Sequence, residues 1–306
     1  MAIVSTSTNA FFERSRSNLQ DLRAQTEKLQ AQLSSGKKLA RSSDDPVAAS
    51  RLRSLSRLES LSNIDKSNSQ RVNADLTLAD AAIKDMSTAL VRAQELATQA
   101  ASGTSNDAQR AAIGRELDSI YSTLMNLANA RDSNGHALFG GESAGDAYSV
   151  DGAGNPVYVG TASSGSLSLG EGQTVSRSLT GPEFLSFTVN GTPTDLLSVV
   201  KDLGAALQGA AADPAGAARD GLDALKAGLD AMTTGQTVVG TRMAWIELTS
   251  DRRTNLSQLR STEETEIGST DIASTAASLQ EALLVLEASQ ASFTKLANLS
   301  LFNKLG

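Results

Sequence analysis

The sequence predicts a mainly α-helical protein: an elongated antiparallel helical bundle, or coiled-coil rod, formed by both termini, with a small antiparallel β insertion at its distal tip. Near both ends of the chain, apolar residues recur at alternating steps of three and four, which is the pattern of a coiled-coil seam. Aromatic residues make up only 4% of the 306 residues. Helices packed through small side chains suit an elongated bundle better than a compact core, because each aromatic ring would bury far more surface. Residues 132–193 are rich in Gly, Ser, Thr and Asn, and the helical period disappears there.

The first helix is expected over about residues 5–35. It is followed by Gly36, and glycine is the usual residue just beyond the C-terminus of a helix. A lone helix with a narrow apolar stripe is marginal in water, so we expect another helix to cover this one. The stripe consists of Phe12, Leu19, Leu22, Leu29 and Leu33, with Thr26 in register.

Two further helices are expected over about residues 46–101 and 107–131. Asp44 or Asp45 is suited to accept free N–H groups at the start of the longer one, and Pro46 fits its first turn. The apolar seam of the longer helix is Val72, Leu76, Ala79, Ile83, Met86, Leu90, Ala93 and Ala97.

Short alternating segments between turn residues predict the β insertion within residues 132–193. Residues 151–156 and 190–191 carry the Asp-Gly and Asn-Gly signals of hairpin turns. The expected strands are residues 147–150, 157–159, 166–169 and 184–189.

The helical pattern returns after the insertion. Two segments, around residues 196–207 and 222–232, are weaker predictions because glycines interrupt them. From about residue 236 to the end the chain is again expected to be helical, with a break near 268–271. The last helix carries the second seam, Ile272, Ala276, Leu279, Leu283, Leu286, Phe293 and Ala297, with Gln290 in register.

This pattern predicts three parts. Residues 1–45 and 255–306 are expected to form a terminal coiled-coil assembly domain. Residues 46–131 and 194–254 are expected to form a helical rod domain, and residues 132–193 the β-rich outer insertion. If the two ends pair, the termini lie together and the insertion is the far tip.

Composition excludes several classes of protein. A net charge of −7 and an isoelectric point near 4.9 argue against a nucleic-acid partner, which needs a basic surface. The chain has no cysteine, so disulfides and thiolate metal sites are excluded. No apolar run approaches the roughly 20 residues that cross a bilayer, so we expect no membrane segment. The N-terminus lacks the pattern of a cleaved secretion signal, and we expect a cytoplasmic protein or export without cleavage.

No motif in the sequence indicates an enzyme. The one histidine, His136, lies beside a glycine turn and is expected to be a turn or surface residue rather than a metal ligand. The acidic run at residues 263–266 is expected to be a solvated helix face. We therefore expect no catalytic residue, no cofactor and no bound metal.

Three stretches resemble a known family. Residues 32–39 with 42–50 hold a Ser-Gly-Lys string followed by Asp-Asp-Pro, residues 124–129 with 134–141 hold the entry to the insertion, and residues 286–305 form a matching tail. Together they resemble the flagellin-type axial proteins of the bacterial flagellum over roughly half the chain. Within that family, Pro46 and the tail residues 299–302 are more like junction subunits than filament flagellins.

The resemblance implies a structural role. Such a subunit is exported through the flagellar type III apparatus without a cleaved signal, and its ends are typically disordered until it assembles outside the cell. The implied function is an adapter ring joining the hook to the filament, and the alternative is filament flagellin itself. A third alternative is an adhesive or ligand-binding insertion. The implied partners are copies of the chain in a ring, a neighbouring hook-associated junction protein, flagellin, and an export chaperone for the C-terminal helix.

The two terminal seams supply the expected assembly interface. As a hypothesis, the leucines of the first helix face those of the last helix, and the end of the tail contacts neighbouring subunits. The expected interface residues are Leu19, Leu22, Leu29, Leu33, Leu279, Leu283, Leu286, Phe293, Leu299, Leu301 and Phe302.

Overall fold

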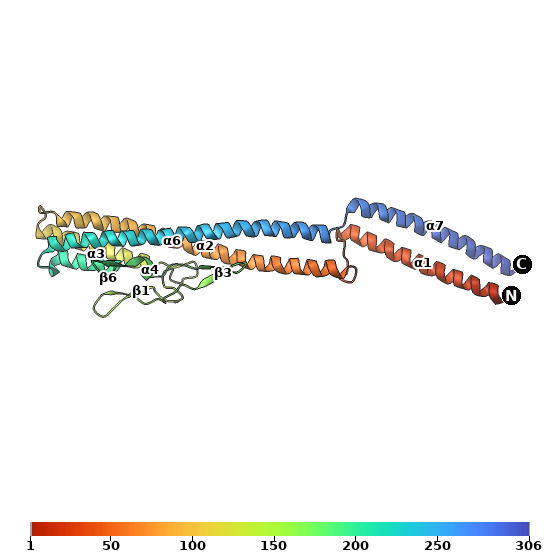
Figure 1. The fold of residues 1–306 in the computed structure, drawn as a ribbon, viewed down its shortest axis with the longest axis horizontal. Helices are drawn as coiled ribbons and strands as arrows, with labels where there is room; N and C mark the ends of the chain where they lie inside the picture. Colours follow the sequence, from red (N-terminus) through yellow and green to blue (C-terminus); the bar gives the residue numbers. More distant parts are fainter. Residues whose placement is uncertain (1, 306) are drawn as a thin grey trace. The chain divides into compact units, whose positions relative to one another are not determined.

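The computed structural model describes the backbone of residues 2–305 and side-chain burial for residues 10–296. In chain order the helices are α1 (Ala2–Ser35), α2 (Pro46–Ala101), α3 (Asp107–Ala128), α4 (Gly181–Leu185), α5 (Leu196–Ala205), the π-helical turn η1 (Ala206–Ala210), α6 (Pro214–Gly268) and α7 (Ile272–Leu305) (Figure 1). The strands are β1 (Tyr148–Val150), β2 (Pro156–Tyr158), β3 (Ser166–Gly170), β4 (Gln173–Ser176), β5 (Ser186–Val189) and β6 (Thr192–Asp195). The mainly α fold class is thus confirmed.

The chain divides into two compact units. One contains the residues up to 60 and from 255 onward, and the other contains residues 61–254. The long helices α2 and α6 contribute residues to both. The three-part division expected from the sequence is a division by role, and it stays a prediction.

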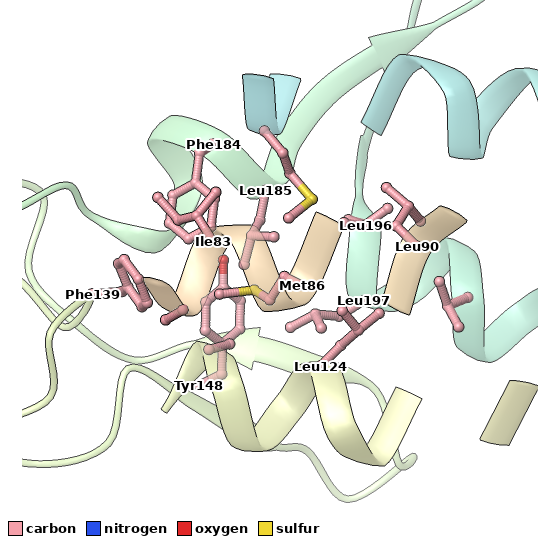
Figure 2. Close-up of a cluster of buried hydrophobic side chains, with 14 of the residues drawn as sticks. Ile83, Met86, Leu90, Leu124, Phe139, Tyr148, Phe184, Leu185, Leu196 and Leu197 are labelled. Atoms are coloured by element: carbon pink, nitrogen blue, oxygen red, sulfur yellow. The ribbon is translucent and has the colours of Figure 1, made fainter. Parts of the chain in front are cut away.

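The second unit is built on the predicted seam of α2. Every residue of that seam, from Val72 to Ala97, is fully buried in one continuous core with α3, α5 and α6. Figure 2 shows Met86 and Leu90 of α2 converging with Leu124 of α3 and Leu197 of α5. A spacing of three and four residues keeps one face of a helix toward its neighbours, which is why the sequence alone located this core.

The glycines of α6 lie where α4 and α5 pack closely against this helix, and they do not interrupt it. Gly221, Gly228 and Gly235 recur every seven residues and so lie on one face. A Cβ at Gly235 would lie 2.6 Å from Cβ of Phe184 in α4, and one at Gly228 would lie 2.6 Å from Leu196 at the start of α5. The weak segment expected around residues 222–232 and the helix expected from about residue 236 are therefore one continuous helix, because the missing side chains leave room for α4 and α5.

The insertion consists of separate antiparallel hairpins. β1 pairs with β2, β3 with β4 and β5 with β6, and the turns at residues 151–156 and 190–191 lie where the sequence predicts them. Residues 184–185 are helical and not part of a strand as expected. There the Glu183 side chain accepts the backbone N–H and the hydroxyl of Thr180, the residue before α4, and starts the helix.

The hairpins lie along the side of the helices of their unit. Asn68 of α2 donates to the carbonyl of Ser168 at 3.2 Å, and Arg253 of α6 donates to that of Leu169 at 2.8 Å. At the end of the unit where α2 meets α3, the chain turns from one helix into the next. The expected position of the insertion at the distal tip of the whole chain stays a prediction. Two-stranded hairpins are marginal by themselves, and packing against helices supplies the missing burial.

One half-buried carboxylate starts α5 and gives a testable prediction. Asp195 accepts the N–H of Leu197 at 2.9 Å and the hydroxyl of Tyr148 at 3.3 Å. Burial raises the pKa of Asp195, although its hydrogen bonds act in the opposite direction. A raised pKa means that its contribution to stability is present at low pH and is lost as the pH rises through that value.

We expect Asp195→Ala to lower the free energy of unfolding by about 1–2 kcal/mol, because the helix loses its cap. Asp195→Asn keeps an acceptor and cannot ionise, so it should match the parent at low pH and exceed it as the pH rises. Urea unfolding from pH 4 to pH 8 measures both effects. Parallel pH profiles for the parent and Asp195→Asn would contradict the assignment.

Candidate assembly interface

The terminal helices α1 and α7 form an antiparallel pair within the first unit (Figure 1). Toward the chain ends, the rings of Phe12 and Phe293 meet edge to face with centroids 5.6 Å apart. At the other end, Thr270 donates its N–H to the carbonyl of Gly36 at 3.0 Å, and Lys38 donates to that of Gly268 at 2.8 Å. The two contacts fix the direction and the register of the pair.

The connection between α1 and α2 is held by the paired aspartates. Asp45 caps α2 by accepting the N–H groups of Val47 at 3.1 Å and Ala48 at 2.9 Å. Asp44 accepts the N–H of Arg41 at 2.9 Å, and this bond lowers the pKa of Asp44. Of the two capping residues considered from the sequence, the structure selects Asp45.

The predicted seam of α1 lies against α7. The four leucines of this stripe are half-buried and Thr26 is buried between them. Their spacing repeats every seven residues, as in a two-helix coiled coil. They are Leu19, Leu22, Leu29 and Leu33.

The seam of α7 follows a register that differs from the expected one. Leu279, Leu286 and Phe293 are half-buried as expected, but the position between the first two is taken by buried Ala282. Leu283 points away and is 47% exposed. Ile272 is exposed as well, since Thr275 takes the inner position there. The sequence could not choose between adjacent apolar residues, because alanine and leucine both satisfy the three-and-four pattern.

The outward side of α7 carries an apolar ridge, which we define as Leu283, Leu284 and Val285. These consecutive residues are 47%, 69% and 42% exposed. Consecutive residues of a helix point in different directions, so one partner helix cannot cover all of them. A helix that is apolar on several faces is normally buried.

Sequence reasoning missed Leu284 and Val285, although a signal for them exists. The charged residues of the 34-residue helix α7 are only Glu281, Glu287, Lys295 and Lys304. The equally long α1 carries nearly twice as many. A helix with few charged residues on any of its faces is expected to be covered on more than one face. The three-and-four spacing of a coiled-coil seam identifies only one of them. The expected residues Leu299, Leu301 and Phe302 lie outside the residues whose side chains the structure describes.

Another polar cluster of the described residues lies around His136. His136 is half exposed, with Nδ1 3.6 Å from a carboxylate oxygen of Asp132, at the edge of a cavity of about 150 Å³. Arg177 extends between Asp132 and Asp75 in the same cavity. Among the described residues, no three His, Asp or Glu side chains are grouped to hold a metal ion. In the same part of the chain, no helix is long and apolar enough to cross a membrane.

Comparison with known proteins agrees with this architecture. Residues 6–144 match the family model of the bacterial flagellin N-terminal helical region. Over 135 residues the chain is 33% identical to flagellar hook-associated protein 3 of Salmonella typhimurium, an alignment that covers 44% of this chain and 43% of that protein. The chain spans less than half the length of this curated relative. These similarities confirm the resemblance seen in the sequence.

Solved structures show the same fold. A protein of Vibrio parahaemolyticus described as a flagellar hook-associated protein superposes with a TM-score of 0.67 and 21% identity, covering 74% of this chain and 100% of that one. Flagellar hook-associated protein 3 of Legionella pneumophila superposes with a TM-score of 0.64 and 13% identity, covering 71% of this chain and 98% of that one. At these identities the likeness establishes the fold.

Proposed function

We propose, from the premise that this chain is a flagellin-family axial protein resembling hook-associated protein 3, that it is a structural subunit of the bacterial flagellum. Its role would be an adapter ring that joins the hook, through another hook-associated protein, to the flagellin filament. One observation carries the proposal: α7 covers its seam with α1 but leaves the apolar ridge at residues 283–285 open to water.

The exposed ridge supports association with copies of the same chain. Burying the ridge contributes roughly 25 cal/mol for each Å² of apolar surface removed from water, and this gain is repeated at every subunit of a closed ring. We infer that α7 is covered by neighbours in the assembly, by the next hook-associated protein or by flagellin, and that an export chaperone covers it beforehand.

The same surface explains how premature assembly would be avoided. A two-helix pair of this kind has little core of its own, so the order of the terminal helices would depend on association. The proposed location is extracellular, on the flagellum, after export without a cleaved signal. The proposal includes no enzymatic activity, and the adhesive role considered for the insertion has no observation in its favour.

Filament flagellin is the second candidate, because the matched family model is the flagellin N-terminal region itself. The two candidates differ in whether the purified protein polymerises without other components. Purified flagellin would polymerise into long tubes alone, whereas a junction subunit would need a hook end and would stop after a limited layer. Electron microscopy of the purified full chain, with and without isolated hooks, separates the two.

Deletion of the gene in its host tests the function directly. We expect cells with complete hooks, no filaments, and flagellin released into the medium. Hooks and junctions that are complete but lack only filament material would identify a flagellin instead. Normal filaments and normal motility would contradict both proposals.

A further inference from the structure

The β3–β4 hairpin lies along α2 and is attached to it at both ends. At the open end of the hairpin, Arg177 extends toward Asp75 of α2, with 3.6 Å between the charged atoms. At the turn, Ser168 donates its hydroxyl to Asp65, ten residues earlier on α2, at 3.3 Å. Ten helical residues span about 15 Å, close to the length of a five-residue strand. The hairpin therefore lies roughly parallel to this segment of α2.

The turn of the hairpin is held by polar contacts. Arg253 of α6 donates through one nitrogen, Nη2, to the Ser69 hydroxyl at 2.8 Å and to the Leu169 carbonyl at 2.8 Å. This single side chain connects α6, α2 and β3. The ion pair of Arg252 with Glu171, at 2.9 Å, is exposed on both sides and so contributes little.

The turn also contains an unusual backbone. Gly170, Glu171 and Gly172 have successive φ values of 98°, 51° and 76°. Glycine adopts positive φ without cost, but Glu171 does not. Beneath the turn, Leu169 and Val175 are buried, with 1% and 6% exposure. A short two-stranded hairpin with polar attachments and one strained residue belongs to the least stable parts of a fold.

We propose that the β3–β4 hairpin is a strap that opens from its turn as a unit, without unfolding of the helical core, and that Arg253 sets how often it opens. Opening breaks the hydrogen bond from Arg253 to the Leu169 carbonyl and exposes Val175 to solvent. The core residues of α2 stay covered by α3, α5 and α6. This inference concerns the second unit alone and stands or falls independently of the proposed function.

The absence of cysteine from the chain makes the test simple. Val175→Cys places a single thiol on the buried face of the strap, in β4. Ala97→Cys places one at a fully buried position of α2. The rate at which each folded full-length variant reacts with a thiol reagent reports the opening of its own region. We expect the thiol at position 175 to react about a hundredfold faster, because local opening requires less than global unfolding.

Arg253→Ala, added to each reporter, identifies the holding residue. The reaction at position 175 should accelerate at least about tenfold, since hydrogen bonds from a charged group are lost, and the reaction at position 97 should not change. Arg252→Ala is the matched control and should change neither rate appreciably. Arg253→Lys, which keeps the charge, provides a second variant if the alanine variant folds poorly.

Equal reaction rates at the two positions would contradict local opening of the strap, because both thiols would then report global unfolding. An unchanged rate at position 175 in Arg253→Ala and Arg253→Lys would overturn the role of Arg253. Equal acceleration at both positions would show that Arg253 stabilises the whole unit rather than the strap.

Discussion

Substitution of Leu283 and Leu284 by aspartate is expected to abolish assembly while leaving the fold of the subunit intact. Both side chains are exposed on α7, so the introduced carboxylates are hydrated in the free subunit. They would lose this hydration, at a cost in free energy, only when a neighbour covers the ridge. Each leucine also contributes about 2 kcal/mol when it is buried at an interface. Cells that carry only the double variant should make hooks without filaments.

The matched control is Ser278→Asp, which adds the same charge to an exposed position of α7 without removing apolar surface. It should leave assembly intact. Leu29→Asp is expected to prevent assembly by a different route, because Leu29 is half-buried against α7 and its loss separates the helix pair. Circular dichroism of the purified variants measures helix content, and electron microscopy counts filaments. Filaments of normal length from Leu283→Asp/Leu284→Asp would show that the ridge is not an interface.

The second large effect is expected at a glycine of α6. Gly235→Ala places a Cβ 2.6 Å from Cβ of Phe184, a fully buried residue next to the backbone of α4. That atom cannot move without shifting α4, and overpacking of this kind costs about 1–3 kcal/mol. The helix propensity gained from alanine, about 1 kcal/mol, offsets only part of this. We expect a net loss of up to about 2 kcal/mol in the free energy of unfolding.

Gly240→Ala, in the same helix, serves as the control because no atom outside its own stretch of helix backbone lies within 4 Å of the added carbon. It should stabilise the protein by about 0.5–1 kcal/mol through propensity alone. Urea unfolding followed by circular dichroism measures both variants. Two substitutions of identical chemistry are thus expected to have opposite signs. Stabilisation by Gly235→Ala would contradict the close packing of α4 on α6.

Much of the helical framework was predictable from periodicity and caps. The seam of α2 is buried without exception, and its bounds, Pro46 and Ala101, are those expected. The break between α6 and α7 also falls where predicted, at residues 269–271. Local signals were sufficient here, because a capping aspartate, a proline and a glycine each act within one turn of the chain.

The sequence by itself determined the bounds of the long helix α2, the break before α7, and where two of the three hairpins turn. Tertiary structure alone decided that Ala282 rather than Leu283 faces α1, that α6 continues through its glycines, and that the hairpins lie along the helices. The physical reason is that periodicity specifies a face only to within one residue. Which neighbour comes close enough to touch that face depends on atoms that are distant in the chain, such as Phe184 beside Gly235.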